Sequence, residues 1–165
     1  TGSFRNSNTS PETHRMAAVL LETGIDHAAI TAQVLLERST VGLRAAGRVY
    51  SDAIFDANGA ICLATVSREM TEELGIQEPD LEGIVDNMVF TTGVEIAALA
   101  IQRDSNRVKF SLRSRADADV CRIAQNLSPT GGGHRKAAGA TLEGSLDHCV
   151  RVFLDEARAG LARIR

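Results

Sequence analysis

The residues best suited to chemistry form one short segment of three glycines, a histidine and two cations: Gly131, Gly132, Gly133, His134, Arg135 and Lys136. A glycine run costs conformational entropy and buries no side chain, so it is kept where the backbone approaches another group or adopts positive φ. Successive backbone N–H groups form a concavity that binds anions. The segment therefore favours binding of a phosphate or a nucleotide, with His134 as a further donor. The competing interpretation is a flexible loop ending in a solvated basic pair, since short glycine motifs often occur without a ligand.

Arg113 is the second candidate, because it ends a segment with the alternation of a strand. Apolar residues alternate there with Lys109, Ser111 and Arg113, so Arg113 lies on the face opposite the apolar row. Its planar guanidinium matches a phosphate or a carboxylate, and Ser114 follows it directly. Without further context, an ordinary solvated arginine is the default interpretation of the residue.

The overall charge limits the size of the ligand. The chain has 165 residues, 44% of them hydrophobic, and a formal net charge of −3. These values indicate a globular protein without the basic field that draws a protein onto long nucleic acid. A small anionic ligand fits better than a long duplex. No apolar run approaches the length needed to cross a membrane and nothing resembles a secretory signal, so we expect a cytoplasmic protein.

The sequence predicts neither a metal site nor a disulfide framework. Cys62, Cys121 and Cys149 are far apart and odd in number, which favours reduced thiols. His148 and His27 each follow an aspartate within a predicted helix and are interpreted as surface residues. We expect no catalytic or metal-ligating residue in this chain.

The C-terminal part of the chain predicts an α+β fold. Strand-like segments at 48–55 and 61–66 flank Asn58-Gly59, the strongest short-range hairpin signal. A second hairpin is predicted from 94–103 and 107–113. The result is a mixed sheet built on two hairpins with flanking helices. The helices are expected at 68–74, 80–88, 117–127 and from Ser145 onward, and the glycine segment is expected to be a loop before an apolar stretch at 137–142.

The N-terminal part predicts helices. Ser10-Pro11 starts one helix that Gly24 ends, and Asp26 caps the next. We predict three parts: helical residues 1–36, a connector at 37–47, and a domain at 48–165. The chain begins at Thr1 and its first methionine is Met16, so we expect it to be part of a longer protein.

Several segments together resemble one known family. The stretch VKFSLRS (108–114) and then GGGHRKAAGATLEGS (131–145) are similar to the DHH-associated domain that closes DHH-family phosphoesterases. The segments ICLATVSRE (61–69), LEGIVD (81–86) and GVEIAAL (93–99) agree with it. The start, TGSFRNSNTSPET (1–13), resembles the end of the catalytic DHH domain. The resemblance is to the branch of nanoRNases and bifunctional oligoribonuclease/pAp phosphatases, close to the RecJ-like group.

The resemblance implies which residues hold the substrate. It places Gly132, Gly133 and His134 on the substrate phosphate or base, with Arg113 and Ser114 lining the same site. Arg5 is implied to reach the catalytic cleft. Residues 1–36 would then be the end of the DHH catalytic domain, and residues 48–165 the substrate-binding domain.

The resemblance also implies an enzyme whose metals lie outside this chain. The family's catalytic domain holds two divalent metals, manganese or magnesium, through aspartates and an Asp-His-His motif, which this sequence lacks. The full-length protein would hydrolyse short oligoribonucleotides or linear dinucleotides, with pAp as a further candidate substrate, whereas this portion alone would be inactive. Two alternatives stay open: a nucleic-acid-binding module without catalysis, as in the C-terminal domain of alanyl-tRNA synthetases, and a cyclic-dinucleotide phosphodiesterase of the same superfamily.

Overall fold

The computed structural model describes residues 2–5 and 7–163. The chain divides into two compact units, with the boundary between Arg38 and Ser39. Each unit is described by itself below.

The first unit is helical in its described part. It holds α1 (Pro11–Glu22), α2 (His27–Thr31) and the π-helix η1 (Ala32–Leu36). The predicted caps are confirmed: Ser10 accepts a hydrogen bond from the Thr13 backbone N–H, and Asp26 accepts one from that of Ala29. None of the residues in these three helices is buried.

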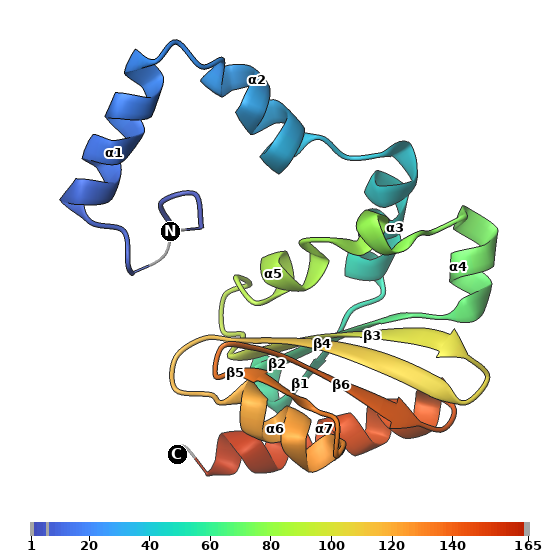
Figure 1. The fold of residues 1–165 in the computed structure, drawn as a ribbon. Helices are drawn as coiled ribbons and strands as arrows, with labels where there is room; N and C mark the ends of the chain where they lie inside the picture. Colours follow the sequence, from blue (N-terminus) through green and yellow to red (C-terminus); the bar gives the residue numbers. More distant parts are fainter. Residues whose placement is uncertain (1, 6, 164–165) are drawn as a thin grey trace. The chain divides into compact units, whose positions relative to one another are not determined.

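The second unit is built on one six-stranded sheet, which confirms the predicted α+β class. The strand order is β1-β2-β3-β4-β6-β5 (Figure 1). All neighbours are antiparallel except β2 and β3, which are parallel, so the sheet is mixed. The bounds are β1 Ile54–Asp56, β2 Ile61–Val66, β3 Ile96–Asp104, β4 Arg107–Ser114, β5 Gly132–His134 and β6 Ala137–Glu143.

Both predicted hairpins are present. β1 and β2 are joined by the one-turn η2 (Ala57–Gly59), where Asn58 has the positive φ that an Asn-Gly turn requires. β3 and β4 pair along almost their whole length. A third hairpin, β5–β6, was not predicted.

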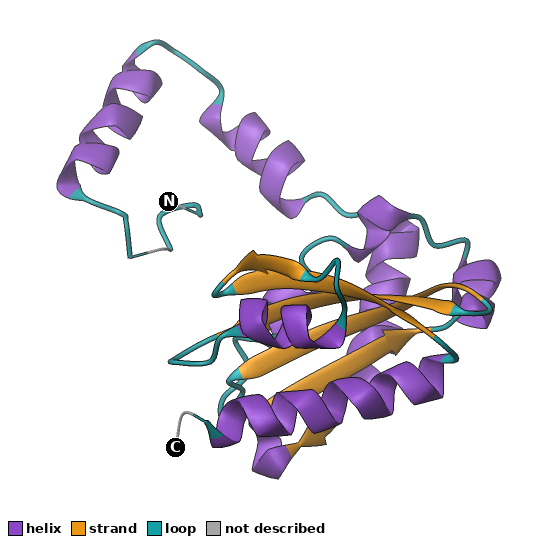
Figure 2. Ribbon diagram, turned by 60° about the horizontal axis from the view of Figure 1, so that its bottom comes forward, coloured by secondary structure: helices purple, strands orange, loops and turns teal. Residues whose placement is uncertain are grey.

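Helices cover the two faces of this sheet (Figures 1 and 2). One face carries α6 (Val120–Leu127) and α7 (Leu146–Ala162). The opposite face carries four elements over β2 and β3: α3 (Thr40–Ser51), α4 (Arg68–Leu74), η3 (Glu78–Leu81) and α5 (Ile84–Met88). Within the described residues, no helix is both long and apolar enough to cross a membrane.

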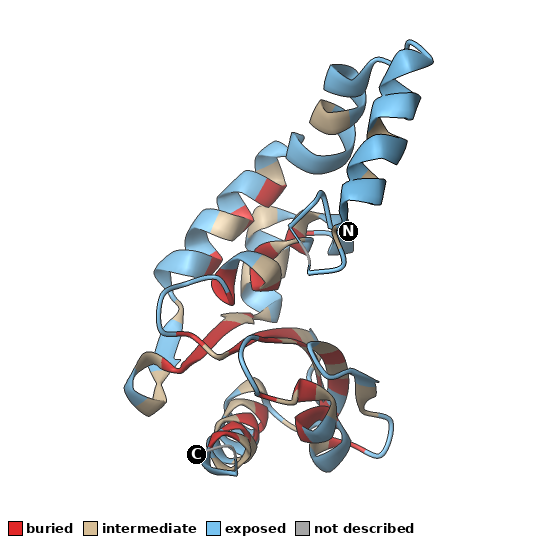
Figure 3. Ribbon diagram, turned by 90° about the vertical axis from the view of Figure 1, so that its left-hand side faces the viewer, coloured by how far each residue is buried: buried red, intermediate tan, exposed pale blue. Residues whose placement is uncertain are grey.

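Strand alternation divides the hydrophobic core in two, one part on each face. Phe110 and Leu112 of β4 pack under α6 and α7, where Phe110 stacks on Phe153 with ring centroids 5.3 Å apart. Leu99 and the residues two positions before and after it on β3, which point to the same side, pack under the helices of the other face. The buried positions therefore gather where helices meet the sheet (Figure 3).

Three predictions about local structure are wrong. Residues 48–51 are not part of a strand, because α3 extends to Ser51 and β1 begins at Ile54. The helix expected at 80–88 is interrupted at Gly83, whose left-handed backbone (φ 75°) separates η3 from α5. The glycine segment also differs from the expected loop, since its residues 132–134 form the edge strand β5.

Candidate substrate-binding site

Backbone packing requires two of the three glycines. A Cβ on Gly131 would lie 1.9 Å from the carbonyl oxygen of Ala124, which is in the last turn of α6. Gly133 has φ +138°, and a Cβ there would lie 2.6 Å from the carbonyl oxygen of Ala137. A Cβ on Gly132 would meet nothing within 4 Å. The packing of the chain therefore explains Gly131 and Gly133 but leaves open space above Gly132.

The strand register places three of the predicted site residues, Arg113, Gly132 and His134, in two rows. These rows are Arg113–Ala137–His134 and Ser111–Gly139–Gly132, each crossing β4, β6 and β5. Residues opposite each other in antiparallel strands point to the same face, so Arg113 and His134 share a face, two strand spacings or about 10 Å apart. Only alanine and glycine lie between them. We call these six residues the glycine platform; all of them are half-buried or exposed.

Arg113 reaches from the platform toward α5. Its Nε donates to Oδ1 of Asp86 at 2.6 Å, its Nη2 lies 3.5 Å from Oδ2, and its Nη1 donates to the Leu112 carbonyl oxygen at 3.1 Å. A guanidinium has five N–H groups, so one remains on each terminal nitrogen. Two N–H groups on neighbouring nitrogens form the fork that binds two phosphate oxygens. Arg113 can therefore bind a phosphate without releasing Asp86.

His134 stands exposed at the other end of the same row. Among the described residues, no hydrogen bond or ion pair engages its ring. The imidazole is thus available to a ligand that lies across Ala137.

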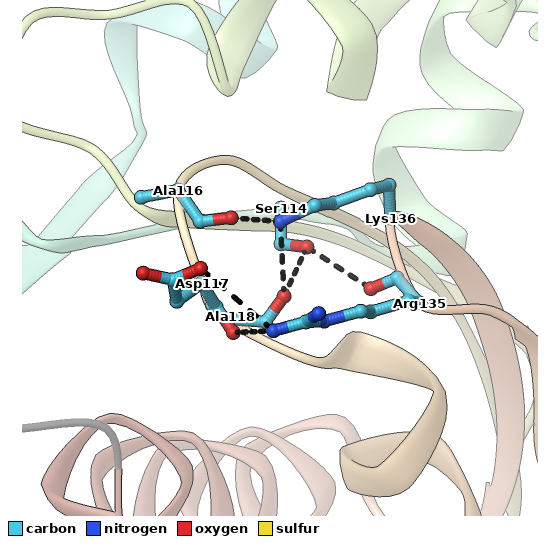
Figure 4. A network of polar contacts seen from close by, with 6 residues as sticks. All are labelled: Ser114, Ala116, Asp117, Ala118, Arg135 and Lys136. Carbon is cyan, nitrogen blue, oxygen red and sulfur yellow. Dashed lines mark hydrogen bonds and ion pairs between the residues drawn. The ribbon is translucent and has the colours of Figure 1, made fainter.

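The turn between β5 and β6 is fastened to the loop that follows β4 (Figure 4). Arg135 Nη2 donates to the carbonyl oxygen of Asp117 at 2.9 Å, and Lys136 Nζ donates to that of Ala116. The buried hydroxyl of Ser114 lies 2.8 Å from the Ala118 carbonyl oxygen and 3.1 Å from that of Arg135.

These contacts show how Ser114, Arg135 and Lys136 serve the fold. Ser114 has its hydroxyl turned to carbonyl oxygens, and both cations fold back onto the loop instead of extending from it. A part in substrate binding stays a prediction for all three. Arg5 belongs to the first unit, where its Nε donates to the Gly2 carbonyl oxygen at 3.1 Å, and its predicted role likewise stays a prediction.

A cavity of about 490 Å³ adjoins the platform and is lined by Ser111 and Arg113 along with residues of η3 and α5. This volume is typical of pockets for small ligands, about 300–1,000 Å³. At its edge Glu78 accepts hydrogen bonds of 2.7 Å from both Lys109 and Arg103. The hydrogen bond from Lys109 and then that from Arg103 lower the pKa of the Glu78 carboxyl. Lys109 thus has its charge engaged by Glu78, whereas Arg113 keeps free N–H groups.

The chain offers no place for a catalytic metal within its described part. There, no three side chains of the His, Cys, Asp and Glu types come together in a group that could hold an ion. All three cysteines are free thiols. Burial raises the pKa of the thiols of Cys62 and Cys149, so they do not fit a metal-thiolate site.

Comparison with known proteins now connects this geometry to a family. A sequence profile described as the DHHA1 domain matches residues 58–162, which include the whole platform. The chain belongs to the DHHA1 domain family. Over 164 residues this DHHA1 chain is 35% identical to the bifunctional oligoribonuclease and PAP phosphatase NrnA of Thermus thermophilus. The match covers 99% of the chain and 48% of NrnA, so the chain spans about half the length of that relative.

Solved structures agree with the DHHA1 assignment. An exopolyphosphatase-related protein from Bacteroides fragilis is similar with a TM-score of 0.89 and 26% identity, covering 96% of this chain and 46% of that one. RecJ from Thermus thermophilus in complex with Mg²⁺ is similar with a TM-score of 0.52 and 18% identity, covering 94% and 21%. At that identity the likeness to RecJ shows the fold alone.

Sequence reasoning singled out Arg113, His134 and the glycines as candidates but did not include Asp86, the partner of Arg113. The pair is 27 residues apart and forms only because α5 packs beside the end of β4. The available signal was the segment LEGIVD, which ends in Asp86 and is part of the family resemblance.

Proposed function

We propose that this chain is the substrate-holding part of a phosphoesterase that hydrolyses short oligoribonucleotides or linear dinucleotides, and the 3′-phosphate of pAp. In this proposal the glycine platform holds a substrate phosphate. The catalytic metals, Mn²⁺ or Mg²⁺, belong to a DHH domain elsewhere in the full-length protein.

The observation that carries the proposal is the row Arg113–Ala137–His134. It combines a guanidinium fork with an available imidazole above a floor without bulky side chains. A phosphate needs several donors that converge from different directions, and backbone can come close to it only where side chains are absent. Gly132, with open space at its Cβ position, supplies that close approach.

The similarity to NrnA supports the choice of substrate. It extends over 99% of this chain, and the name of that protein specifies an oligoribonuclease and a PAP phosphatase. Both substrates are short, which agrees with a chain of net charge −3 that has a local rather than a global attraction for phosphate.

The test is hydrolysis of a dinucleotide by the full-length protein with Mn²⁺ present. His134→Ala should lower kcat/KM about tenfold to a hundredfold, because a hydrogen bond to a charged group contributes roughly 1.5–3 kcal/mol. Arg113→Ala should lower it at least as much, since a charge and a fork of donors are lost together. Thermal melts of both variants should stay close to that of the parent protein.

Arg107→Ala is the matched control. Arg107 is an arginine at the other end of the same strand, exposed and paired with Asp104. Its loss should leave kcat/KM nearly unchanged, because an exposed ion pair contributes little. If Arg113→Ala and His134→Ala behaved like Arg107→Ala, the platform would not be the substrate site.

A further inference from the structure

Phe90 is an aromatic residue that packing within the second unit does not explain. It lies two residues beyond the end of α5 and is 64% exposed, although Met88 and Val89 before it are buried. The guanidinium carbon of Arg115 lies over its ring, 5.2 Å from the centroid. One face of the ring therefore already holds a planar cation, at a distance typical of cation–π contacts.

This pair lies beside the proposed phosphate-binding residues. Asp86 and Phe90 are four residues apart in the segment that begins with α5. Asp86 contacts Arg113, and Phe90 contacts Arg115, two residues further along the end of β4. Residues four apart in a helical segment are neighbours on one side, about one turn or 5.4 Å apart. Phe90 thus follows Asp86, the partner of the proposed phosphate-binding arginine, by about one helical turn of the chain.

The backbone fixes both members of the pair. The N–H of Phe90 donates to the Asn87 carbonyl oxygen at 3.1 Å, which prolongs the last turn of α5. The N–H of Arg115 donates to the Glu95 carbonyl oxygen at 2.8 Å, which continues the pairing of β4 with β3 by one residue. The ring is exposed yet attached to regular structure.

We infer that Phe90 and Arg115 form a stacking subsite for a nucleobase of the substrate, and this inference rests on the proposed function. Every nucleobase has a flat π-face that stacks on an aromatic ring or a guanidinium plane. The Phe90 ring and the Arg115 guanidinium offer both surfaces, and neither offers the paired donors and acceptors that read a base edge. The subsite takes any base and adds affinity without sequence preference.

A tryptophan at position 90 tests binding without catalysis. The chain contains no tryptophan. The tryptophan fluorescence that the full-length protein gains on Phe90→Trp, relative to the parent protein, therefore comes from position 90. The probe is the adenine dinucleotide pApA, titrated in EDTA so that no hydrolysis occurs. Saturable quenching of the added fluorescence is expected. The matched control is Val152→Trp, an exposed position on α7 on the opposite face of the sheet, where no quenching is expected. Absent quenching at position 90, or equal quenching at both positions, overturns the inference.

Kinetics separate this subsite from the phosphate site. Phe90→Ala and Phe90→Leu should each raise KM for pApA about tenfold, because stacking on an aromatic ring is lost in both. We expect kcat to stay within about twofold, since the reacting phosphate is held elsewhere. A dinucleotide analogue with its bases removed should show no difference between Phe90→Ala and the parent.

The outcomes distinguish the two proposals. If Arg113→Ala is impaired while both Phe90 variants keep the parent KM, the stacking subsite is wrong and the phosphate site stands. If Arg113→Ala and His134→Ala keep the parent kcat/KM, the proposed function is wrong, and the stacking subsite, which rests on it, is wrong as well.

Discussion

The two faces of strands β4 and β6 carry different kinds of residue. On the face under α6 and α7 the positions are large or apolar and buried, among them Phe110, Leu112 and Leu142. On the other face the same strands carry Ser111, Arg113, Ala137 and Gly139, none of them buried. The strands are shared, so backbone geometry cannot be the reason for the difference.

The difference indicates what each face is for. A strand face that meets only water usually carries β-branched or larger polar side chains, which favour extended backbone. Glycine and alanine are poor strand formers, yet they form the floor between Arg113 and His134. The proposed phosphate ligand, which needs close access to the backbone, accounts for this floor. At Gly139 the sheet itself adds a reason, because a Cβ would lie 3.1 Å from the carbonyl oxygen of Phe110.

The largest effect is expected on the covered face. Phe110→Ala should lower the free energy of unfolding by about 3–5 kcal/mol, because it removes a fully buried ring that stacks on Phe153. Thermal and urea unfolding of the full-length protein measure this loss. Ser111→Ala, the next residue along β4 but on the open face, should change stability by less than about 0.5 kcal/mol. Equal losses for the two variants would mean that both faces are packed alike.

Two neighbouring glycines sharpen the comparison further. Gly133→Ala should destabilise the protein by about 1–3 kcal/mol, because φ is positive and the Cβ would meet the backbone of Ala137. Gly132→Ala should leave the melting temperature nearly unchanged but lower kcat/KM about tenfold or more by displacing the substrate. Melts and kinetics on a dinucleotide separate the two effects. Unchanged kinetics for Gly132→Ala would show that nothing approaches the backbone there.

The smallest effect is expected at Asp86, which positions Arg113 without being part of the platform. Asp86→Ala should lower kcat/KM by about threefold to fivefold, less than Arg113→Ala, because a partly exposed ion pair contributes up to about 1 kcal/mol. Asp86→Asn keeps one carbonyl acceptor and should recover part of the loss. A rise in kcat/KM for Asp86→Ala would instead mean that the carboxylate competes with the substrate phosphate for Arg113.

Much of the fold was predictable where the sequence signal is local. The Asn58-Gly59 turn, the alternation of β4 and the caps at Ser10 and Asp26 each specify their structure within a few residues. Helix α3 was not predicted as a packed element, because its buried residues Gly42, Ala45 and Val49 are small and its Leu43 is exposed. Hydrophobic periodicity in the sequence therefore does not reveal the buried side of this helix.

The site was only partly predictable for a related reason. The residue types at Arg113 and His134 carry their own chemical signal, but the row that unites them depends on pairing between strands distant in sequence. Strand β5 was mistaken for a loop because glycine has low strand propensity, and its hydrogen bonds to β6 override that preference. The uses of Arg135 and Lys136 were equally hidden, since their acceptors are backbone carbonyls some twenty residues earlier in the chain.

The single parallel pairing, between β2 and β3, has a consequence for the order of folding. The hairpins β3–β4 and β5–β6 join segments close in sequence, whereas β2 and β3 are separated by residues 67–95. Bringing the two ends of such a long connection together costs chain entropy before any stabilising contact has formed. Parallel pairs of this kind therefore form slowly. Asp86 and Phe90 lie within that connection. When the unfolded chain refolds, we expect the β5–β6 hairpin to form early, and Arg113 and Arg115 to gain their partners only after the slow pairing of β2 with β3 is complete.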